Sequence, residues 1–585
     1  MKQAICAIDF GTSGTTYAYA FIDSKDDIIH AKWPNSPDLK NSTEIILNEK
    51  FETIIFGYEC QKYLGDLSSS KEKFYHFTDI KMKLYNKEKN IKATNNNTEL
   101  KIEEVISKIL IFIKKEALKE IQSIRPKIKE SDINWKVTVP AIWDNNSKKI
   151  MQNASKIAGI FSEPITFFAL EPEAAACDYV SEKSSDKEAI KVGNKYIICD
   201  IGGGTVDIST HERINDNNNI YIEEAYPPCG GDHGSTYINK AFIEKVIKKI
   251  FGKEAMDELT KIINNPQLNK DIYIDYCILL EEIENFKINI KNKVPNYATK
   301  RGSNEAKRIN CTLFENLIKN DIDIDTLINN YNQNCPDKWK ITDYSKFKIY
   351  FPYQIMIDLT KEIIVFKVVN HLKHILKNVP NIQSIIYAGS VSSNDFIISM
   401  IKERIPECPN HYRSAFPSIA VAKGAVIFGF DPYIIKSRIS KFTIGIRVSE
   451  KWNELIHGKR KDLKFFDKEY NYYCCSNVFS PIIYREQKIN INEVKCNNYN
   501  MRSSQAKIRF YKTIYKNVKF IDEKSISLKK KCYQFGELIF DVGDKFDKNS
   551  RGIVVELYLG GTFIDAKIKY KEIEKSAIFD FSLEE

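Results

Sequence analysis

Two short motifs, far apart in the chain, share one pattern and constrain the fold more than any other feature of the sequence. Residues 4–8 (AICAI) form an apolar run typical of a buried strand, and they lead directly into DFGTSGTT at 9–16. Residues 196–199 (YIIC) lead in the same way into DIGGGT at 200–205. Each strand therefore ends in aspartate, one apolar residue and glycine, followed by small residues and threonine. The repetition predicts an internal duplication, with two related lobes that face one another.

Both motifs fit loops that bind phosphate. A phosphate chain needs close approach of the backbone and many N–H donors, and glycine allows both because it has no side chain and tolerates positive φ. Serine and threonine hydroxyls add further donors. The segments that meet this need are Gly11-Thr12-Ser13-Gly14 and Gly202-Gly203-Gly204-Thr205. One such loop alone could be a tight hairpin turn, but two copies after strand-ending aspartates favour phosphate binding.

Aspartates stand beside both loops. Asp9, Asp200 and Asp207 would place carboxylate oxygens next to the phosphates. Mg²⁺ prefers hard oxygen ligands and usually keeps several waters, so these groups could hold the ion's waters and orient an attacking one. Any of the three taken alone could be a turn-capping aspartate. The sequence contains no GxxxxGK[ST] loop, no GxGxxG opening a helix, no GxSxG and no HExxH, which disfavours the usual rival sites.

The segments around the motifs alternate between strand and helix patterns, which predicts an α/β architecture. Apolar residues recur at helical spacing over 101–121, and residues 135–139 form a strand that ends at Pro140. Further predicted elements are a helix with Ile150, Ala154, Ile157 and Ala158 on one face and Gly159 at its end, a helix over 353–378, a strand over 383–388 and a helix over 420–430. After about residue 436, short β-prone runs separated by turn residues predict an all-β domain.

Composition narrows the class of protein. A chain of 585 residues is too long for one core, so we expect at least two domains. The net charge of +10 is spread along the chain without a basic cluster interleaved with aromatic residues, so we expect no nucleic-acid partner. No stretch approaches the roughly 20 apolar residues of a membrane span. Thirteen scattered cysteines without a CxxC pair indicate reduced thiols and a cytoplasmic protein.

Several blocks, in order, resemble the seventy-kilodalton heat-shock family of the actin/hexokinase-like ATPase superfamily. They are AIDFGTSGTTYAYAF, KVTVPAIWDNNSKKIMQNASKIAGI, FALEPEAAACDYV, YIICDIGGGTVDIST, CGGDHGSTYIN and IIYAGSVSSNDFI, which together cover about residues 4–430. The longer first loop, the ending KGAVIFGFDPYIIKSRISKFTIGI and the β-rich tail without a helical lid are most similar to the divergent member-12 branch. The resemblance implies a two-lobed actin-like ATPase domain with a duplicated core, over 1–436, and a β-rich domain over 437–585.

The resemblance also implies roles at the metal. Asp9 and Asp200 would lie near Mg²⁺ and its waters, and Glu171 would hold a magnesium-bound water. Lys81, in IKMKLY, would position the attacking water, although the neighbouring Lys83 could take that role.

At the nucleotide, the resemblance implies that Asp207 and Thr205 flank the γ-phosphate and the attacking water. Glu284 and Lys287, as E-x-x-K on a helix, would clasp the adenosine, although the same spacing is common on a solvated helix face. The residues that would line the nucleotide are Gly231, Gly389 and Ser390. The implied ligands are ATP or ADP and Mg²⁺.

Departures from the family pattern leave the function open between two hypotheses. The adenosine motif reads AGSV where the family has two adjacent glycines, DPYIIKSRISKF replaces the acidic, leucine-rich linker, and a helical lid is missing. The first hypothesis is a slow Mg²⁺-dependent ATPase that couples nucleotide state to a polypeptide client or partner protein on the C-terminal domain, with co-chaperones. The alternative is a nucleotide-binding scaffold or regulatory protein with little or no turnover. A small-molecule kinase would need a substrate pocket that nothing in the sequence marks, and the appended β domain disfavours a filament-forming actin relative.

Overall fold

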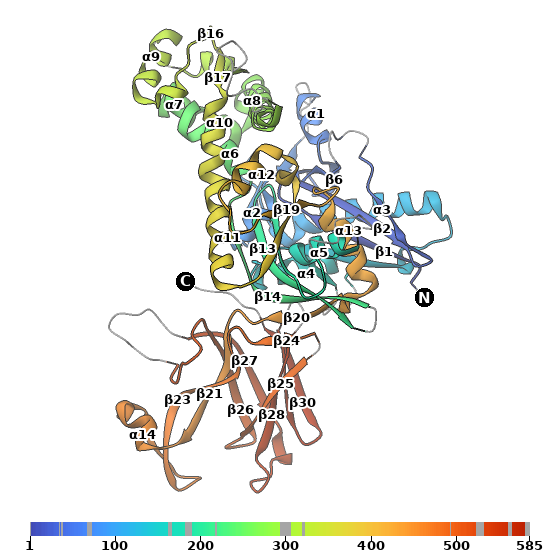
Figure 1. Cartoon of the computed structure of the whole chain (residues 1–585), viewed down its shortest axis with the longest axis vertical. Helices are drawn as coiled ribbons and strands as arrows, with labels where there is room; N and C mark the ends of the chain where they lie inside the picture. The colour runs from blue at the N-terminus through green and yellow to red at the C-terminus, as the bar shows by residue number, and fades with distance from the viewer. Residues whose placement is uncertain are drawn as a thin grey trace.

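Two lobes and a β-rich region make up the protein (Figure 1). The structure, a computed structural model, describes residues 2–33, 36, 39–66, 73–161, 167–181, 190–216, 219–292, 306–318, 322–491, 493–521, 532–559 and 564–579. Along the long axis, the β-rich region lies at one end, and helices α7 to α10 of the second lobe lie at the other (Figure 1).

The first lobe is built on a six-stranded mixed sheet. Its main path runs β11 (Phe168–Leu170), β10 (Ile133–Val139), β1 (Ala4–Phe10), β2 (Gly14–Phe21) and β3 (Ser24–His30), with β4 (Asn41–Ser42) paired to β2. Strand β1 is antiparallel to β2 and parallel to β10. Residues on β1 are buried throughout, as expected for a central strand whose sequence is apolar except for Asp9.

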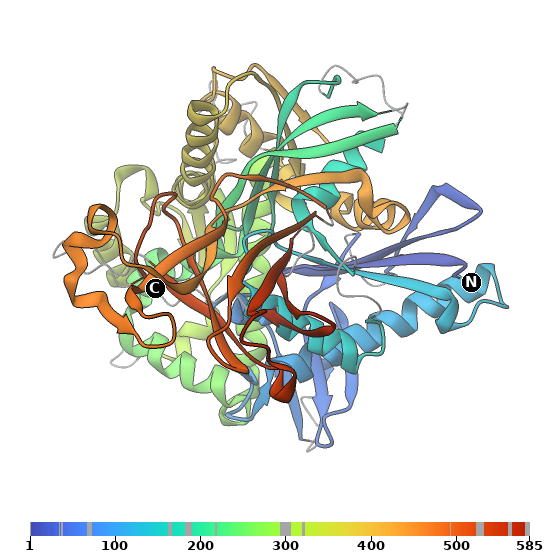
Figure 2. The same cartoon turned by 90° about the horizontal axis from the view of Figure 1, so that it is seen from below.

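The second lobe repeats this topology. Its sheet runs β19 (Asn410–Arg413), β18 (Ile382–Ala388), β12 (Lys195–Ile201), β13 (Val206–Asp216), β14 (Asn219–Gly231), β20 (Ile435–Ile439) and β24 (Lys488–Asn490). Strand β12 is antiparallel to β13 and parallel to β18, as β1 is to β2 and β10. The first five strands therefore follow the same order and directions in both lobes, as the repeated motifs predicted. Viewed end-on, the two lobes lie on either side of the molecule (Figure 2).

The predicted helices are present. They are α3 (Ile102–Ile124), α4 (Asn145–Ile157), α10 (Tyr353–Thr360), α11 (Phe366–Asn378) and α13 (Ala420–Phe430). A π-helical turn, Lys361–Val365, joins α10 to α11, so the predicted helix over 353–378 is continuous but locally widened. The predicted apolar face of α4 is wrong in one residue, because Ile157 is 55% exposed while Ala154 and Ala158 are buried. The helix ends there, and its last apolar side chain projects past the core.

Helices α5 (Glu171–Ser181) and α13 lie between the two sheets. Their small residues share an apolar cluster with Ile5 and Ala7 of the first sheet and with Ile198 and Ile386 of the second. A Cβ on Gly424 of α13 would lie 1.6 Å from the carbonyl oxygen of Ala174, so the helices cross in direct backbone contact. The lobes are thereby joined at one side of the cleft.

The lobes also touch away from this crossing. Helix α1 (Glu59–Asp66) of the first lobe contacts α8 (Lys270–Ile288) of the second. Ile46, Cys60 and Leu64 belong to the same apolar cluster as Tyr273 of α8. The remaining elements of the second lobe's upper part include α6 (Thr236–Phe242), α7 (Lys248–Asn264), α9 (Ile324–Asn334) and the three-stranded sheet β15 (Ala306–Asn310), β17 (Lys348–Pro352) and β16 (Tyr344–Ser345).

Two facing sheets form the C-terminal region. One runs β22 (Lys464–Asp467), β23 (Tyr472–Ile483), β21 (Thr443–Lys451), β26 (Gln505–Thr513) and β27 (Tyr533–Asp541), and the other runs β25 (Glu493–Asn500), β28 (Gly552–Leu559), β29 (Ile564–Tyr570) and β30 (Ile573–Phe579). Ile446 and Phe510 of the first sheet share a core with Val555 and Ile568 of the second, as in a β-sandwich. The predicted domain boundary at residue 436 falls inside β20. In the described part of the chain, no helix combines the length and the apolar character needed to cross a membrane.

Candidate functional site

Each of the two predicted phosphate loops connects the two strands of the central hairpin in its sheet. The loops meet one another across the cleft. Residues 11–13 join β1 to β2, and residues 202–205 join β12 to β13. A Cβ on Gly203 would lie 2.3 Å from Ser13 Oγ, and one on Gly204 would lie 2.4 Å from Thr12 Oγ1. Glycine is needed at both positions because the opposite loop occupies the space that a side chain would fill.

Both loops line a single cavity between the lobes. It is lined by Asp9, Gly11, Thr12, Ser13, Gly14, Lys40, Lys81, Glu171, Asp200, Gly202, Gly203, Gly204, Thr205, Gly389, Ser390 and Val421. The two halves of the chain therefore contribute carboxylates and backbone amides to the same space, as the duplicated motifs predicted. Gly389, at the end of β18, has φ +84°, and a Cβ there would lie 2.3 Å from Asp200 Oδ1.

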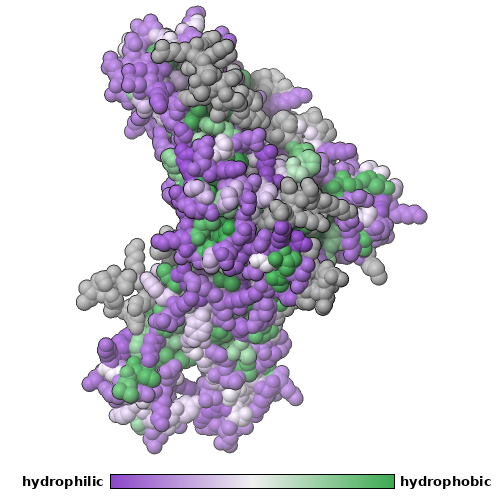
Figure 3. Space-filling model, in the orientation of Figure 1, coloured by the Kyte–Doolittle hydropathy of each residue, from purple (hydrophilic) through white to green (hydrophobic). Residues whose placement is uncertain are grey.

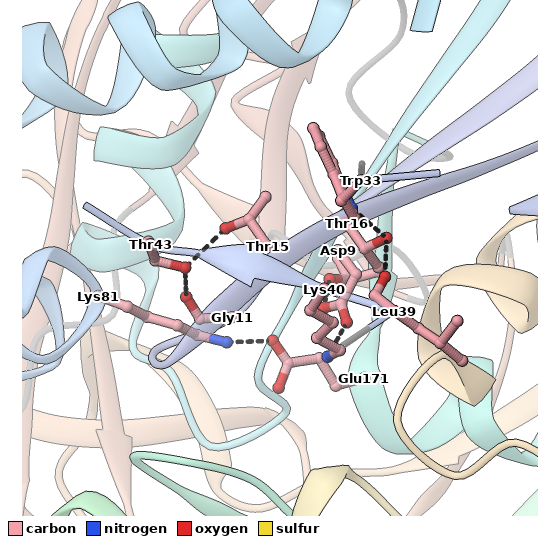
Figure 4. Close-up of polar contacts among 11 residues, drawn as sticks. Asp9, Gly11, Thr15, Thr16, Trp33, Leu39, Lys40, Thr43, Lys81 and Glu171 are labelled. Carbon is pink, nitrogen blue, oxygen red and sulfur yellow. Dashed lines mark hydrogen bonds and ion pairs between the residues drawn. The ribbon is translucent and has the colours of Figure 1, made fainter. Parts of the chain in front are cut away.

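Lys81 and Glu171 form a buried ion pair within the first lobe. Lys81 lies on α2 (Ile80–Tyr85), Glu171 begins α5, and their Nζ and Oε1 atoms are 2.5 Å apart (Figure 4). Burial raises the pKa of Glu171, and the nearby Asp207 and Asp9 raise it further, while Lys81 opposes the shift. Lys83 instead forms an exposed pair with Glu88 at 3.3 Å. Of the two lysines that the sequence left open, only Lys81 reaches the cavity.

Asp200 and Asp207 face one another across the β12–β13 hairpin, where they are paired in register. Burial raises the pKa of Asp200 to about 7, with a further contribution from the negative charge of Asp207. Asp207 Oδ1 accepts a hydrogen bond of 3.3 Å from the backbone N–H of Ile142. Its Oδ2 is buried and has no hydrogen-bond partner among the described residues. This free acceptor fits a bound water or a hydrated ion.

Asp9 has two hydrogen-bond donors of its own. Lys40 Nζ lies 2.6 Å from Oδ2 (Figure 4). Thr138 Oγ1 donates to Oδ1 at 2.8 Å. Burial alone would raise the pKa of Asp9, but the charges of Lys40 and Lys81 hold it below its usual value. Asp9 is therefore ionised near neutral pH.

The arrangement fits Mg²⁺ held through its waters. Carboxylate oxygens of Asp9, Glu171 and Asp200 surround a cavity rich in backbone amides, and these are hard ligands suited to that ion. Within the described residues, no three histidine, cysteine or acidic side chains are close enough to bind one ion directly. Water and phosphate oxygens would therefore complete the ion's coordination, as is usual for Mg²⁺.

Comparisons with known proteins agree with this geometry. A model of the Hsp70 protein family matches residues 57–220. Heat shock 70 kDa protein 12A of Mus musculus is 24% identical over 601 residues, covering 90% of this chain and 84% of that relative. The chain is therefore similar to the Hsp70 family over the matched segment and to heat shock 70 kDa proteins 12A and 12B over most of its length. Heat shock 70 kDa protein 12B of Homo sapiens is 23% identical and covers 84% of this chain. Chaperone protein DnaK of Mycoplasma mobile is 29% identical but covers only 49% of this chain and 40% of its own length.

This similarity agrees with the paired sheets, since the Hsp70 family implies an actin-like, two-lobed fold. The match to protein 12A covers 90% of this chain and so includes part of residues 437–585, whereas the DnaK match covers about half of the chain. The member-12 resemblance stated from the sequence is therefore confirmed.

Four of the residues that the Hsp70 resemblance assigned to the nucleotide do not line the described cavity. One is Asp207, which pairs in register with the cavity residue Asp200. Gly231 ends β14, opposite Val206. Glu284 and Lys287 of α8 form an ion pair of 2.6 Å, and Lys287 Nζ also donates to the carbonyl oxygen of Ser235 at 3.3 Å. The Ser235 N–H donates in turn to the carbonyl oxygen of Gly202. The Glu284–Lys287 pair is therefore connected to the second phosphate loop through Ser235 and does not contact it directly in these hydrogen bonds. Their assignment to adenosine stays a prediction.

Lys40 is the charged residue of this site that the sequence did not reveal. It lies in a segment of turn residues between β3 and β4, outside the two motifs that we compared. No spacing or periodicity marks a single lysine in such a segment. Its place becomes visible only when β4 pairs with β2 and brings the segment beside the first phosphate loop.

Proposed function

We propose that the protein binds ATP with Mg²⁺ in the cleft between its lobes and hydrolyses it slowly. The observation that carries this proposal is the convergence of both glycine loops, three carboxylates and Lys81 on one cavity. Phosphoryl transfer requires mainly positioning and charge stabilisation, and a site of this composition supplies both. The Hsp70-family matches support the same ligand.

The chain's own residues have distinct roles in this proposal. Mg²⁺, when bound, neutralises phosphate charge. The backbone amides of 11–14 and 202–205 bind the phosphate oxygens, and Thr205 adds a hydroxyl donor. Lys81 holds Glu171 in place and directs its remaining N–H donors toward the cavity. The unpaired Oδ2 of Asp207 is the acceptor best suited to orient an attacking water.

We further propose that residues 1–436 act as the ATPase domain and 437–585 as a partner-binding domain. Arg438 on β20 donates two hydrogen bonds of 2.7 Å to Glu173, two residues after Glu171 on α5. The backbone N–H of Ile439 donates to Glu224 of β14 at 2.5 Å. These contacts support coupling, since a movement of α5 against the second lobe would strain the strand that leads into the C-terminal domain. A ligand shifts such a movement only through its differential affinity for the two arrangements.

An exposed apolar patch supports partner binding by the C-terminal domain. Leu455, on the short helix α14 (Glu454–His457), is 98% exposed, and Ile456, Phe466 and Tyr473 are also exposed. Figure 3 shows exposed hydrophobic side chains in the region where Figure 1 labels α14. Patches of this kind on otherwise polar surfaces commonly bind other proteins. An extended, apolar polypeptide segment is the partner that we propose.

Single-turnover hydrolysis of ATP with Mg²⁺, measured beside nucleotide affinity, tests the proposal. We expect the wild-type protein to hydrolyse ATP, and Asp200→Ala and Glu171→Ala to bind ATP but turn it over far more slowly. Tight binding without turnover by the wild type would favour the alternative of a nucleotide-binding scaffold. Absence of adenine-nucleotide binding would overturn the proposal as a whole.

A further inference from the structure

The cavity contains two lysines, and the proposed hydrolysis uses only one of them. Lys81 pairs with Glu171, whereas Lys40 pairs with Asp9. The side chains of Lys40 and Asp9 are 18% and 3% exposed, so the pair lies largely out of water. A lysine ammonium is strongly hydrated in solution, and its burial here requires the compensation that a carboxylate provides.

Lys40 is fixed in position by the backbone around it. Thr43 Oγ1 donates to the carbonyl oxygen of Gly11 at 2.8 Å, and Thr16 Oγ1 donates to that of Leu39 at 3.0 Å (Figure 4). Strand β4 begins directly after Lys40 and pairs with β2 at Gly14. Contacts on both sides therefore attach the segment to the first phosphate loop, so that any movement of the loop moves Lys40 as well.

The first phosphate loop also makes room for this side chain. A Cβ on Gly14 would lie 2.9 Å from Lys40 Cβ and 3.6 Å from Lys40 Cδ. The lysine therefore passes over Gly14 to reach Asp9 at the end of β1. Glycine at this position thus serves the lysine as well as the phosphate loop.

The charges around Lys40 are those expected around a bound cation. Asp9, Asp200 and Glu171 line the same cavity as Lys40, and Asp9 pairs with it directly. Three carboxylates of both lobes therefore act on one fixed ammonium group. A divalent ion neutralises carboxylates and phosphates in the same way, which makes the two cations partly interchangeable.

We propose that Lys40 is a positioning residue for the nucleotide's phosphates. Lys40 holds Asp9 and supplies part of the positive charge that a divalent ion would otherwise supply at the phosphates. The inference rests on the proposed nucleotide binding and concerns how strongly that binding depends on Mg²⁺. Nucleotide affinity should then depend less on Mg²⁺ than it would without Lys40.

The test is calorimetric titration of the full chain with ADP, in Mg²⁺ and separately in EDTA. Lys40→Gln keeps a polar side chain that can still donate to Asp9 but removes the charge, and Lys40→Arg keeps the charge. Lys423→Met is a matched control, because Lys423 pairs with Asp178 at 3.0 Å with exposed fractions of 20% and 1% but does not line the cavity. Thermal unfolding of each variant shows whether it is folded.

We expect Lys40→Gln to weaken ADP binding in EDTA by at least about tenfold more than in Mg²⁺, corresponding to about 1.4 kcal/mol. Lys40→Arg should restore most of the affinity, and Lys423→Met should bind ADP as the wild type does in both solutions. An equal loss in Mg²⁺ and EDTA, or no loss, would overturn the inference while leaving nucleotide binding intact. Failure of the wild type to bind ADP in either solution would instead remove the proposed function, and this inference with it.

Discussion

Lys441 donates a hydrogen bond of 3.1 Å to the carbonyl oxygen of Ala141, the residue next to Ile142, whose N–H bonds Asp207. Lys441 follows β20 and therefore belongs to the segment that enters the C-terminal sheets. Through this contact and the Arg438–Glu173 pair, that segment touches the loop whose N–H binds Asp207 and the helix that begins at Glu171. Two separate polar paths thus connect the C-terminal domain to carboxylates of the cleft.

Removing Arg438 should destabilise the protein and weaken communication between the domains. Arg438→Met leaves Glu173 charged and buried, which costs about 3–5 kcal/mol when a buried pair is broken. Adding Glu173→Gln should recover much of the free energy of unfolding in urea, because the unpaired charge is then absent. If coupling depends on the pair, ATP should alter proteolysis of residues 437–585 in the wild type but not in the double variant. An ATP-dependent change in both proteins would contradict this role.

Lys81→Met should reduce ATP turnover by roughly 100-fold or more, because it removes the charge that positions Glu171. Nucleotide affinity should change much less, since the glycine loops remain. Lys83→Met is the control, because Lys83 lies two residues away, pairs with Glu88 at the surface and does not line the cavity. Single-turnover rates of ATP hydrolysis for both variants show which lysine supports turnover. A stronger effect from Lys83→Met would show that the wrong lysine was assigned.

His211 should make the protein sensitive to mild acid. Burial lowers its pKa to about 4 in the folded protein, against 6.5 when exposed. Between these values the unfolded chain binds the proton more readily, so the stability contributed by His211 is complete above pH 6.5 and is lost as pH falls toward 4. At pH 5 the loss is about 2 kcal/mol.

Urea unfolding at pH 7.5 and pH 5, compared between the wild type and His211→Gln, measures this contribution. The wild type should lose more stability between the two pH values than the variant, by roughly the amount given above. Other titrating groups largely cancel in the comparison. Parallel losses in the two proteins would mean that His211 has an ordinary pKa.

Leu455→Asp should weaken binding of an unfolded, reduced and alkylated polypeptide by about tenfold, since burial of a leucine side chain contributes roughly 1.5–3 kcal/mol. Leu268→Asp provides the control, because Leu268 is also well exposed, at 62%, but lies in the second lobe of the ATPase domain. Fluorescence anisotropy of the labelled polypeptide is a suitable measurement. Equal effects of the two substitutions would argue against a partner site at α14.

Local sequence patterns predicted much of the fold, because buried strands and amphipathic helices leave a direct periodic signal. The apolar runs that end at Asp9 and Asp200 predicted β1 and β12, and their repetition predicted the paired sheets. The same motifs predicted most of the cavity lining. Contacts between distant segments left no such signal. The Lys40–Asp9 pair depends on the position of β4, and the Arg438–Glu173 pair joins residues 265 positions apart.

The course of β20 has a practical consequence for dividing the protein into fragments. This strand pairs with β14 on one side and with β24 on the other, so one sheet continues through the expected boundary at residue 436. A cut there would split β20 and leave β14 and β24 with unpaired backbone groups. Open strand edges of this kind readily join those of other molecules. Separately expressed halves should therefore associate or aggregate, and mixing the two halves should rescue their solubility.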